Sequence, residues 1–167
     1  MKEIFKYGKC IFTRPNMANL DDMVEMMNDE EIVSMISLNP KPISREMEIE
    51  WINNNQEGYV FSAYDINSLK YIGNCSFVDI VGNKGEIGIV ICKPMQGNHY
   101  AKDMLNGVMD YGFNTLGLDE IYAIVFSDNV KSLNCIKQLG FVEYKREAID
   151  LHRNGIDVED VYLKKMK

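Results

Sequence analysis

A short polar loop separates an apolar stretch from a helix-like stretch in this sequence. The loop contains Gln96, Gly97, Asn98 and His99, after "EIGIVIC" and before "AKDMLNGVMDYGF". The first amides of a helix lack partners within the helix and carry partial positive charge, so they can hold an anion without a basic side chain. Gly97 permits a ligand to approach the backbone, and the neighbouring amide side chains add neutral donors. This loop is expected either to hold a pyrophosphate or to serve only as a strand-to-helix turn.

The elements around this loop predict a mixed α/β fold in one domain covering residues 1–167. Apolar residues at helical spacing alternate with strand-like stretches that end at Gly or Pro. Ser44 is expected to cap a helix, and Gly117 and Gly140 are expected to end helices. The predicted strands cover residues 9–15, 59–65, 70–80, 86–92, 119–126, 141–151 and 157–165, and the predicted helices cover 17–29, 30–37, 45–56, the stretch after the loop, and 129–139.

Composition narrows the class of protein. The chain has 167 residues, of which 46% are hydrophobic and 26% charged, as in ordinary globular proteins. A net charge of −7 argues against nonspecific binding of nucleic acid, which requires basic surface. No apolar run is long enough to span a membrane, and the first residues do not resemble a signal peptide, so a cytoplasmic location is expected. Cys10, Cys75, Cys92 and Cys135 are scattered, which predicts reduced thiols rather than a metal site or disulfides.

The loop resembles the coenzyme-binding loop of the GNAT superfamily of acetyl-CoA-dependent N-acetyltransferases, especially its RimJ/RimL-like branch. That loop reads Gln/Arg-x-x-Gly-x-Gly/Ala after a strand, and Gln96–Ala101 matches its first and last positions. His99 stands where the family usually has glycine. Two further motifs agree in order and spacing, namely Glu86–Gly88 and the downstream set Asn129, Ser132 and Leu139–Phe141. The resemblance covers nearly the whole chain and implies a splayed, mostly antiparallel sheet flanked by helices.

The resemblance also implies how acetyl-CoA would be held, with no metal involved. Backbone groups of the strand before the loop would contact the coenzyme, and Gly88 is suited to a bulge that splays this strand from its neighbour. Asn129 would bond the pantetheine arm. The implied coenzyme contacts are Ile89, Val90 and Ile91 on the strand, Gln96, Gly97, Asn98, His99, Tyr100 and Ala101 at the pyrophosphate, and Asn129 and Ser132 downstream.

Acetyl transfer to an amine sets three chemical requirements. The amine must lose a proton, the tetrahedral oxyanion needs hydrogen-bond donors, and the leaving thiolate benefits from an acid. Glu86 is either the base, acting through water, or an ordinary solvated glutamate. A backbone N–H near Val90 is the expected oxyanion donor. Ile136 occupies the position where many relatives carry a tyrosine acid, so Ser132 is left as either the acid or a coenzyme contact near the helix start.

We therefore predict an N-acetyltransferase that acts on a protein N-terminal amine or on a small amine, by direct attack in a ternary complex. Acceptor contacts are expected from Met35–Trp51 and from His152–Asp160, with Trp51 itself in the core. An acyl-CoA-binding module without turnover is the alternative, because His99 and Ile136 depart from the family pattern. A dinucleotide-binding fold is disfavoured because the GxGxxG fingerprint is lacking. A homodimer is expected by family analogy alone.

Overall fold

The computed structural model describes residues 2–167, which form one eight-stranded sheet in the order β1-β2-β3-β4-β5-β6-β8-β7. Neighbouring strands are antiparallel, whereas β5 and β6 run parallel. The mixed, mostly antiparallel fold expected from the sequence is confirmed. The strands are β1 (Glu3–Tyr7), β2 (Cys10–Thr13), β3 (Val60–Asp65), β4 (Tyr71–Val81), β5 (Lys84–Ile91), β6 (Glu120–Phe126), β7 (Val142–Arg153) and β8 (Ile156–Met166), and the α-helices are α1 (Leu20–Asn28), α2 (Glu30–Val33), α3 (Arg45–Asn54), α4 (Tyr100–Asp110) and α5 (Val130–Gln138).

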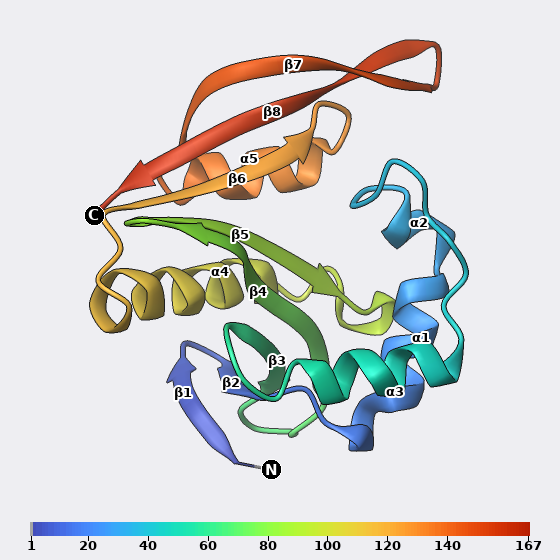
Figure 1. Ribbon diagram of the computed structural model, residues 1–167, viewed down its shortest axis with the longest axis vertical. Coiled ribbons are helices and arrows are strands. Elements are labelled where there is room, and N and C mark those ends of the chain that lie inside the picture. Colours follow the sequence, from blue (N-terminus) through green and yellow to red (C-terminus); the bar gives the residue numbers. More distant parts are fainter. Residues whose placement is uncertain (1) are drawn as a thin grey trace.

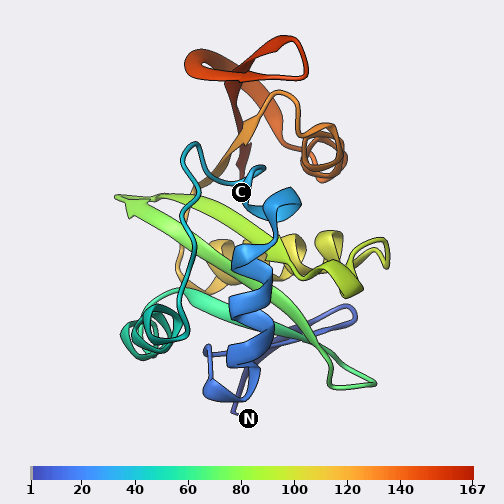
Figure 2. The ribbon, with the colours of Figure 1, turned by 90° about the vertical axis from the view of Figure 1, so that its right-hand side faces the viewer.

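The sheet splits between β5 and β6. Their parallel pairing runs from Lys84 to Glu86 on β5 and from Glu120 to Tyr122 on β6. Beyond these pairs β5 continues along β4 while β6 continues along β8, so the two strands diverge (Figure 1). Figure 2 shows the C-terminal hairpin, with β6 and α5, standing apart from the N-terminal part of the sheet. The split creates two arms with a space between them.

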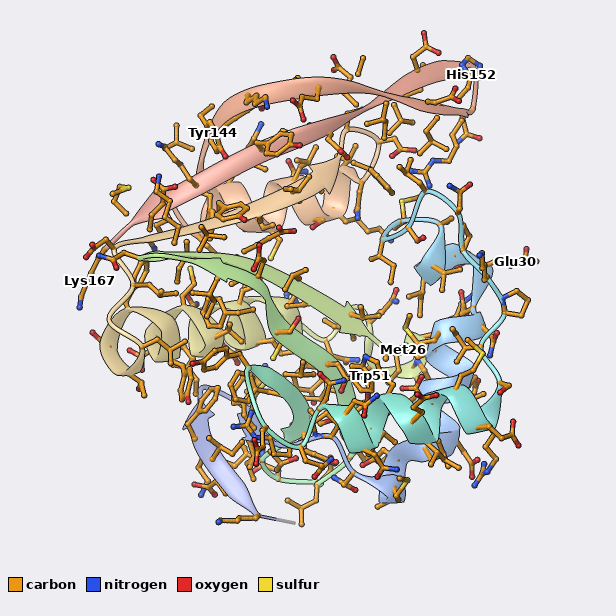
Figure 3. The ribbon with its side chains drawn as sticks, viewed as in Figure 1. Met26, Glu30, Trp51, Tyr144, His152 and Lys167 are labelled. Carbon is orange, nitrogen blue, oxygen red and sulfur yellow. The ribbon has the colours of Figure 1, made fainter. Side chains whose placement is uncertain are left out.

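Helices cover both faces of the N-terminal arm. The larger core lies under α4 and α5 and includes Phe12, Phe61 and Ile121, all of which are fully buried. A second core lies under α1 and α3 and includes Met26, with Trp51 partly buried against it, as expected of a core residue (Figure 3). The apolar residues of β5 therefore alternate between the two cores, which fixes the strand in place.

Local signals at the helix ends act as predicted. The Ser44 hydroxyl accepts a hydrogen bond from the Met47 amide at 3.2 Å and caps α3. Gly140 follows α5 with a φ of 88°, a backbone conformation that favours glycine. α4 is continued by a π-helical turn, Tyr111–Thr115, before Gly117. No helix within residues 2–167 combines the length and the apolar composition that crossing a membrane requires.

Two local expectations were wrong. The first predicted strand was residues 9–15. In the structure a further strand, β1, precedes this segment and pairs with β2 at the edge of the sheet. The bulge was expected at Gly88, whereas the register shift lies opposite, between Phe77 and Asp79 of β4, so that Val78 is the extra residue. A Cβ at Gly88 would meet Val78 Cγ2 at 3.3 Å. The bulge therefore sits on β4, next to the position that was expected to bulge.

Candidate functional site

A cavity of about 850 Å³ occupies the space between the arms. Its floor is the free edge of β5, and its ends are the starts of α4 and α5. The turn that follows α2, Ser34–Ile36, forms a further side, which we call the α2 wall. The predicted site residues that line the cavity are Ile89, Val90, Ile91, Gln96, Gly97, His99, Tyr100, Ala101, Asn129 and Ser132.

The loop before α4 presents its backbone to this cavity. Gly97 and His99 have φ angles of 78° and 66°, and α4 begins directly after His99, at Tyr100. The Gln96 side chain donates to the Ile91 carbonyl at 3.0 Å and ties the loop back to β5. Asn98 instead bonds within the loop, to the carbonyls of Met95 and Gln96, and does not line the cavity. The left-handed conformation at His99 explains why glycine suits this position.

The start of α4 is anchored from behind. The Tyr100 hydroxyl donates to Asp65 at the end of β3, at 2.8 Å. Hydrogen bonds from the backbone and hydroxyl of Ser68, and then from Tyr100, lower the pKa of Asp65 to about 2. The Tyr100 hydroxyl is thus used in a bond within the protein. Tyr100 can therefore contact a ligand only through its backbone at the start of α4. Lys131 adds a positive charge to the cavity from α5.

The free edge of β5 offers backbone donors at alternate residues. Cys92 donates its amide to Ile72 on β4, and the register pairs Val90 with Asn74. Because hydrogen bonding alternates along an antiparallel pair, the backbone of Val90 also faces β4. The amides of Ile89 and Ile91 consequently face the split. The Gln96 bond to the Ile91 carbonyl agrees with this direction. The donors therefore flank Val90 instead of belonging to it.

The first turns of α5 form the opposite side of the cavity. Asn129 caps the helix, its side-chain oxygen accepting from the Ser132 amide at 3.2 Å. Ser132 and Cys135, three residues apart on one helix face, both line the cavity. Ile136 is only 4% exposed and packs in the core. Its side chain therefore does not line the cavity. The sequence predicted only a reduced thiol at Cys135, although its spacing of three residues from Ser132 could have indicated that both face the cavity.

Glu86 lies at the apex of the split, outside the residues that line the cavity. It is paired with Tyr122 on β6, whose hydroxyl lies beside its carboxylate. Burial raises the pKa of Glu86, the nearby charges of Asp79 and Asp160 raise it further, and the Tyr122 hydroxyl partly opposes them by favouring the charged carboxylate. Alternation puts Glu86, residue 88 and Val90 on one face of β5. At residue 88 the side chain is missing, and Val78 of β4 packs against that position.

Sequence reasoning missed the residues that pair with this site across the sheet. Tyr122 reaches Glu86 through the parallel β5–β6 pairing, and Asp160 comes from β8. Neither residue lies in a local sequence motif. Only knowledge of the strand order would have indicated that they lie near Glu86. Among residues 2–167 no group of three or more His, Cys, Asp or Glu side chains is placed to hold a metal ion. The groups that the structure does bring to the cavity include backbone amides, hydroxyls and the charged side chains of Asp128 and Lys131.

All four cysteines lie within residues 2–167 and carry free thiols, as expected. Cys10, Cys75 and Cys92 are buried, and Cys135 is partly exposed in the cavity. Burial raises the pKa of the Cys135 thiol, and Lys102 partly opposes that shift. The thiol form is therefore favoured near neutral pH, and Cys135 offers a chemical probe of the cavity.

The sequence was compared with protein families and with curated proteins. Residues 10–142 match the family described as the acetyltransferase (GNAT) domain. The chain belongs to the GNAT acetyltransferase family. Spermidine N(1)-acetyltransferase of Vibrio cholerae is 29% identical over 92 residues, which make up 54% of this chain and 53% of that protein. The chain thus spans about half the length of that curated relative. An uncharacterised N-acetyltransferase of Bacillus licheniformis, p20, is 27% identical over 133 residues, covering 75% of this chain and 74% of the relative.

Solved structures share the GNAT fold. An acetyltransferase of the GNAT family from Bacillus anthracis superposes with a TM-score of 0.84 at 17% identity, covering 96% of both chains. Spermidine N-acetyltransferase from Vibrio cholerae, in complex with CoA and spermine, has a TM-score of 0.81 at 21% identity, covering 95% of both chains. At these identities the likeness concerns the fold, and the acceptor has to be argued from the residues of this chain.

Proposed function

We propose that the chain transfers the acetyl group of acetyl-CoA to a primary amine by direct attack in a ternary complex. The observation that carries the proposal is the cavity between the arms, which brings a helix N-terminus, the free amides of β5 and the start of α5 around one space. The pyrophosphate is assigned to the loop Gln96–Ala101 and the amides at the start of α4, with Lys131 nearby. The pantetheine arm is assigned to the edge of β5 and to Asn129, whose side-chain nitrogen is not used by the cap.

The chemical step needs few groups. The amine nitrogen attacks the thioester carbon, and Glu86 takes the amine's proton through water. The amide of Ile89 or Ile91 stabilises the oxyanion, in place of Val90 itself. The C–S bond then breaks and coenzyme A leaves as thiolate, which is protonated by solvent or by Ser132. The raised pKa of Glu86 suits a base that must exchange protons at moderate pH.

The acceptor that best fits the base is a small amine with a second positive charge. Asp79 and Asp160 place negative charge near Glu86, and these groups would attract a cation to the face opposite α4. The relatives named as spermidine acetyltransferases support this choice over a protein N-terminus. The RimJ/RimL-like motifs in this sequence, the single domain over residues 1–167 and a homodimer remain predictions. Light scattering at micromolar concentrations tests the last of these.

Release of free coenzyme A from acetyl-CoA, measured with a panel of amines, tests the proposed function. Diamines and polyamines should give the fastest release, and peptides with a free N-terminus should give slower release. The alternative of a binding module without turnover is favoured by the left-handed His99 and by the buried Ile136. Tight acetyl-CoA binding without release in the presence of any amine would decide for that alternative.

Replacement of Ser132 separates a coenzyme contact from an acid. If Ser132 mainly contacts coenzyme, Ser132→Ala should weaken acetyl-CoA binding while kcat at saturation stays nearly intact. Loss of a general acid would instead lower kcat by about 10²–10⁴-fold. We expect the first result from steady-state kinetics. Asn134→Ala, at an exposed position on the same helix, is the matched control. A large fall in kcat with unchanged affinity would contradict the assignment.

Labelling of Cys135 reports on the cavity without any turnover. A thiol reagent should modify one cysteine rapidly in the native protein, because the other three are buried. The rate should rise with pH as the thiolate forms. Saturating acetyl-CoA, which has no free thiol, should slow the reaction, and Cys135→Ser should abolish the rapid phase. A labelling rate that acetyl-CoA leaves unchanged would argue that the ligand does not enter this cavity.

A further inference from the structure

Arg153 connects parts of the chain that are far apart in sequence. It ends β7 at the tip of the C-terminal hairpin, next to His152, which Figure 3 labels. One guanidinium nitrogen, Nη1, donates to the carbonyl of Ser34, the C-cap residue that follows α2. A second, Nη2, donates to Asp128 Oδ1 at 3.0 Å. The hairpin tip thus reaches over the turn after α2, as Figure 1 shows.

The contacts of Arg153 are shielded from solvent. The side chain of Arg153 is 18% exposed and that of Asp128 is 11% exposed. Arg153 Nε lies 2.9 Å from Asp128 Oδ2, an ionic contact that is not a directed hydrogen bond. The guanidinium carbon also lies 5.1 Å from the centre of the Phe126 ring. A planar group with several donors suits this set of partners, and a lysine could satisfy only part of it.

Both hydrogen-bond partners of Arg153 belong to residues that line the cavity. Ser34 begins the α2 wall, which is attached to the N-terminal arm. Asp128 lies on the C-terminal arm and immediately precedes Asn129, the cap of α5. At the apex the arms are held by the short β5–β6 pairing. Arg153 therefore joins the two arms at the open end of the split.

We propose that Arg153 is a positioning residue that clamps the α2 wall to the turn between β6 and α5 and so sets the width of the cavity for coenzyme. This inference rests on the proposed function, because coenzyme is the assigned ligand. With the clamp in place the cavity is held in its binding shape before the ligand arrives. Without it the arms spend part of their time apart, and the apparent affinity falls in proportion to the competent fraction.

The clamp predicts a split between binding and turnover. Arg153→Gln should raise the Kd for acetyl-CoA by about tenfold, the change expected if the competent fraction falls to about one tenth. At saturating acetyl-CoA, kcat should stay within about twofold, since bound ligand selects the closed form. Arg153→Lys should be intermediate. Hydrogen exchange should quicken at the amides of residues 34–36 and 128–132. Loss of fold alone would lower kcat with the active fraction and leave the KM unchanged.

The experiment is titration calorimetry with acetyl-CoA, together with kinetics and exchange, on the wild type, Arg153→Gln, Arg153→Lys and Asp128→Asn. Arg146→Gln is the matched control, because Arg146 lies on the same strand and pairs with Glu143 and Glu159 at the surface. If Arg153→Gln does not fold, Arg153→Lys and Asp128→Asn decide, and unchanged Kd values in both overturn the clamp. If the wild type binds acetyl-CoA and the variants bind it equally tightly, the clamp is overturned and the proposed function stands. A wild type that binds no acetyl-CoA overturns the proposed function and the clamp with it.

Discussion

Glu86→Gln is expected to lower kcat by about 10²-fold or more, the contribution usual for a general base. Glutamine keeps the size of the side chain and cannot accept the amine's proton. Steady-state release of coenzyme A at saturating substrates measures the effect. High pH should partly rescue the variant, because a larger share of the amine is then neutral without help. A variant with near-normal kcat at neutral pH would show that Glu86 is an ordinary strand residue.

Because the pKa of Glu86 is raised, Glu86→Gln should also change the thermal stability of the protein. Because burial raises the pKa in the folded state, the contribution of Glu86 to stability is greatest below the unfolded value and is lost as pH rises through the folded value. At neutral pH the protein therefore bears the cost of a partly buried charge. Glu86→Gln removes that cost, so its melting temperature at pH 7 should equal or exceed that of the wild type. A fall in both activity and stability would indicate a structural role.

A neighbouring charge supplies the companion test. The wild-type rate should fall in acid as Glu86 takes up a proton, with a midpoint above the ordinary glutamate value of about 4.3. Asp79 is exposed and helps to raise the pKa of Glu86. Asp79→Asn should therefore move this acid limb to lower pH, and Glu86→Gln should remove it. An acid limb that stays in place in both variants would assign the titration to another group.

Gly73→Ala is expected to cost about 3 kcal/mol or more of unfolding free energy, at the upper end for a single overpacked position. A Cβ at Gly73 would lie 2.0 Å from the Val90 carbonyl oxygen and 2.9 Å from Ile91 Cα. These are backbone atoms of β5, and they cannot move aside without shifting the edge that carries the proposed oxyanion donors. Urea unfolding measures the loss of stability, and acetyl-CoA titration of the folded fraction should show weakened binding.

Gly82→Ala is the matched control for Gly73→Ala. Gly82 lies in the turn of the same hairpin with a φ of 58°, and a Cβ there would have no atom within 4 Å. Its substitution should cost only the left-handed conformation, about 1–2 kcal/mol. If both variants lost the same stability, the close approach of β4 to β5 would not be the reason for glycine at position 73.

Local signals in the sequence were sufficient for most elements and for the cavity-lining loop. Ser44 and Gly140 marked helix ends because caps depend on one or two residues. β1 was missed because it is a short edge strand whose residues are mostly exposed, and its pattern lacks a clear alternation. The bulge was assigned to Gly88 on composition, but register depends on both strands, and Val78 on the partner took up the extra residue.

The rest of the site depends on contacts between distant strands. Tyr122 joins Glu86 only because β5 and β6 pair in parallel at their starts. Arg153 meets Ser34, 119 positions away in sequence, because the hairpin of β7 and β8 extends across the split. No periodicity or motif in the sequence predicts contacts between residues so far apart. Asn129 and Ser132, in contrast, are close in sequence and were found together, since one turn of helix already places them.

The position of β8 between β6 and β7 has a consequence for synthesis of the chain. β5 can pair with β4 as soon as both have been made, so the N-terminal arm can form early. The apolar strand β6, "EIYAIVF", must wait for β8, which starts 30 residues after β6 ends, at Ile156. Until then β6 is a bare edge that could pair with another chain. Limited proteolysis of ribosome-bound chains of increasing length should show β4 and β5 protected before β6. The cavity between the arms would then be the last part of the protein to be completed.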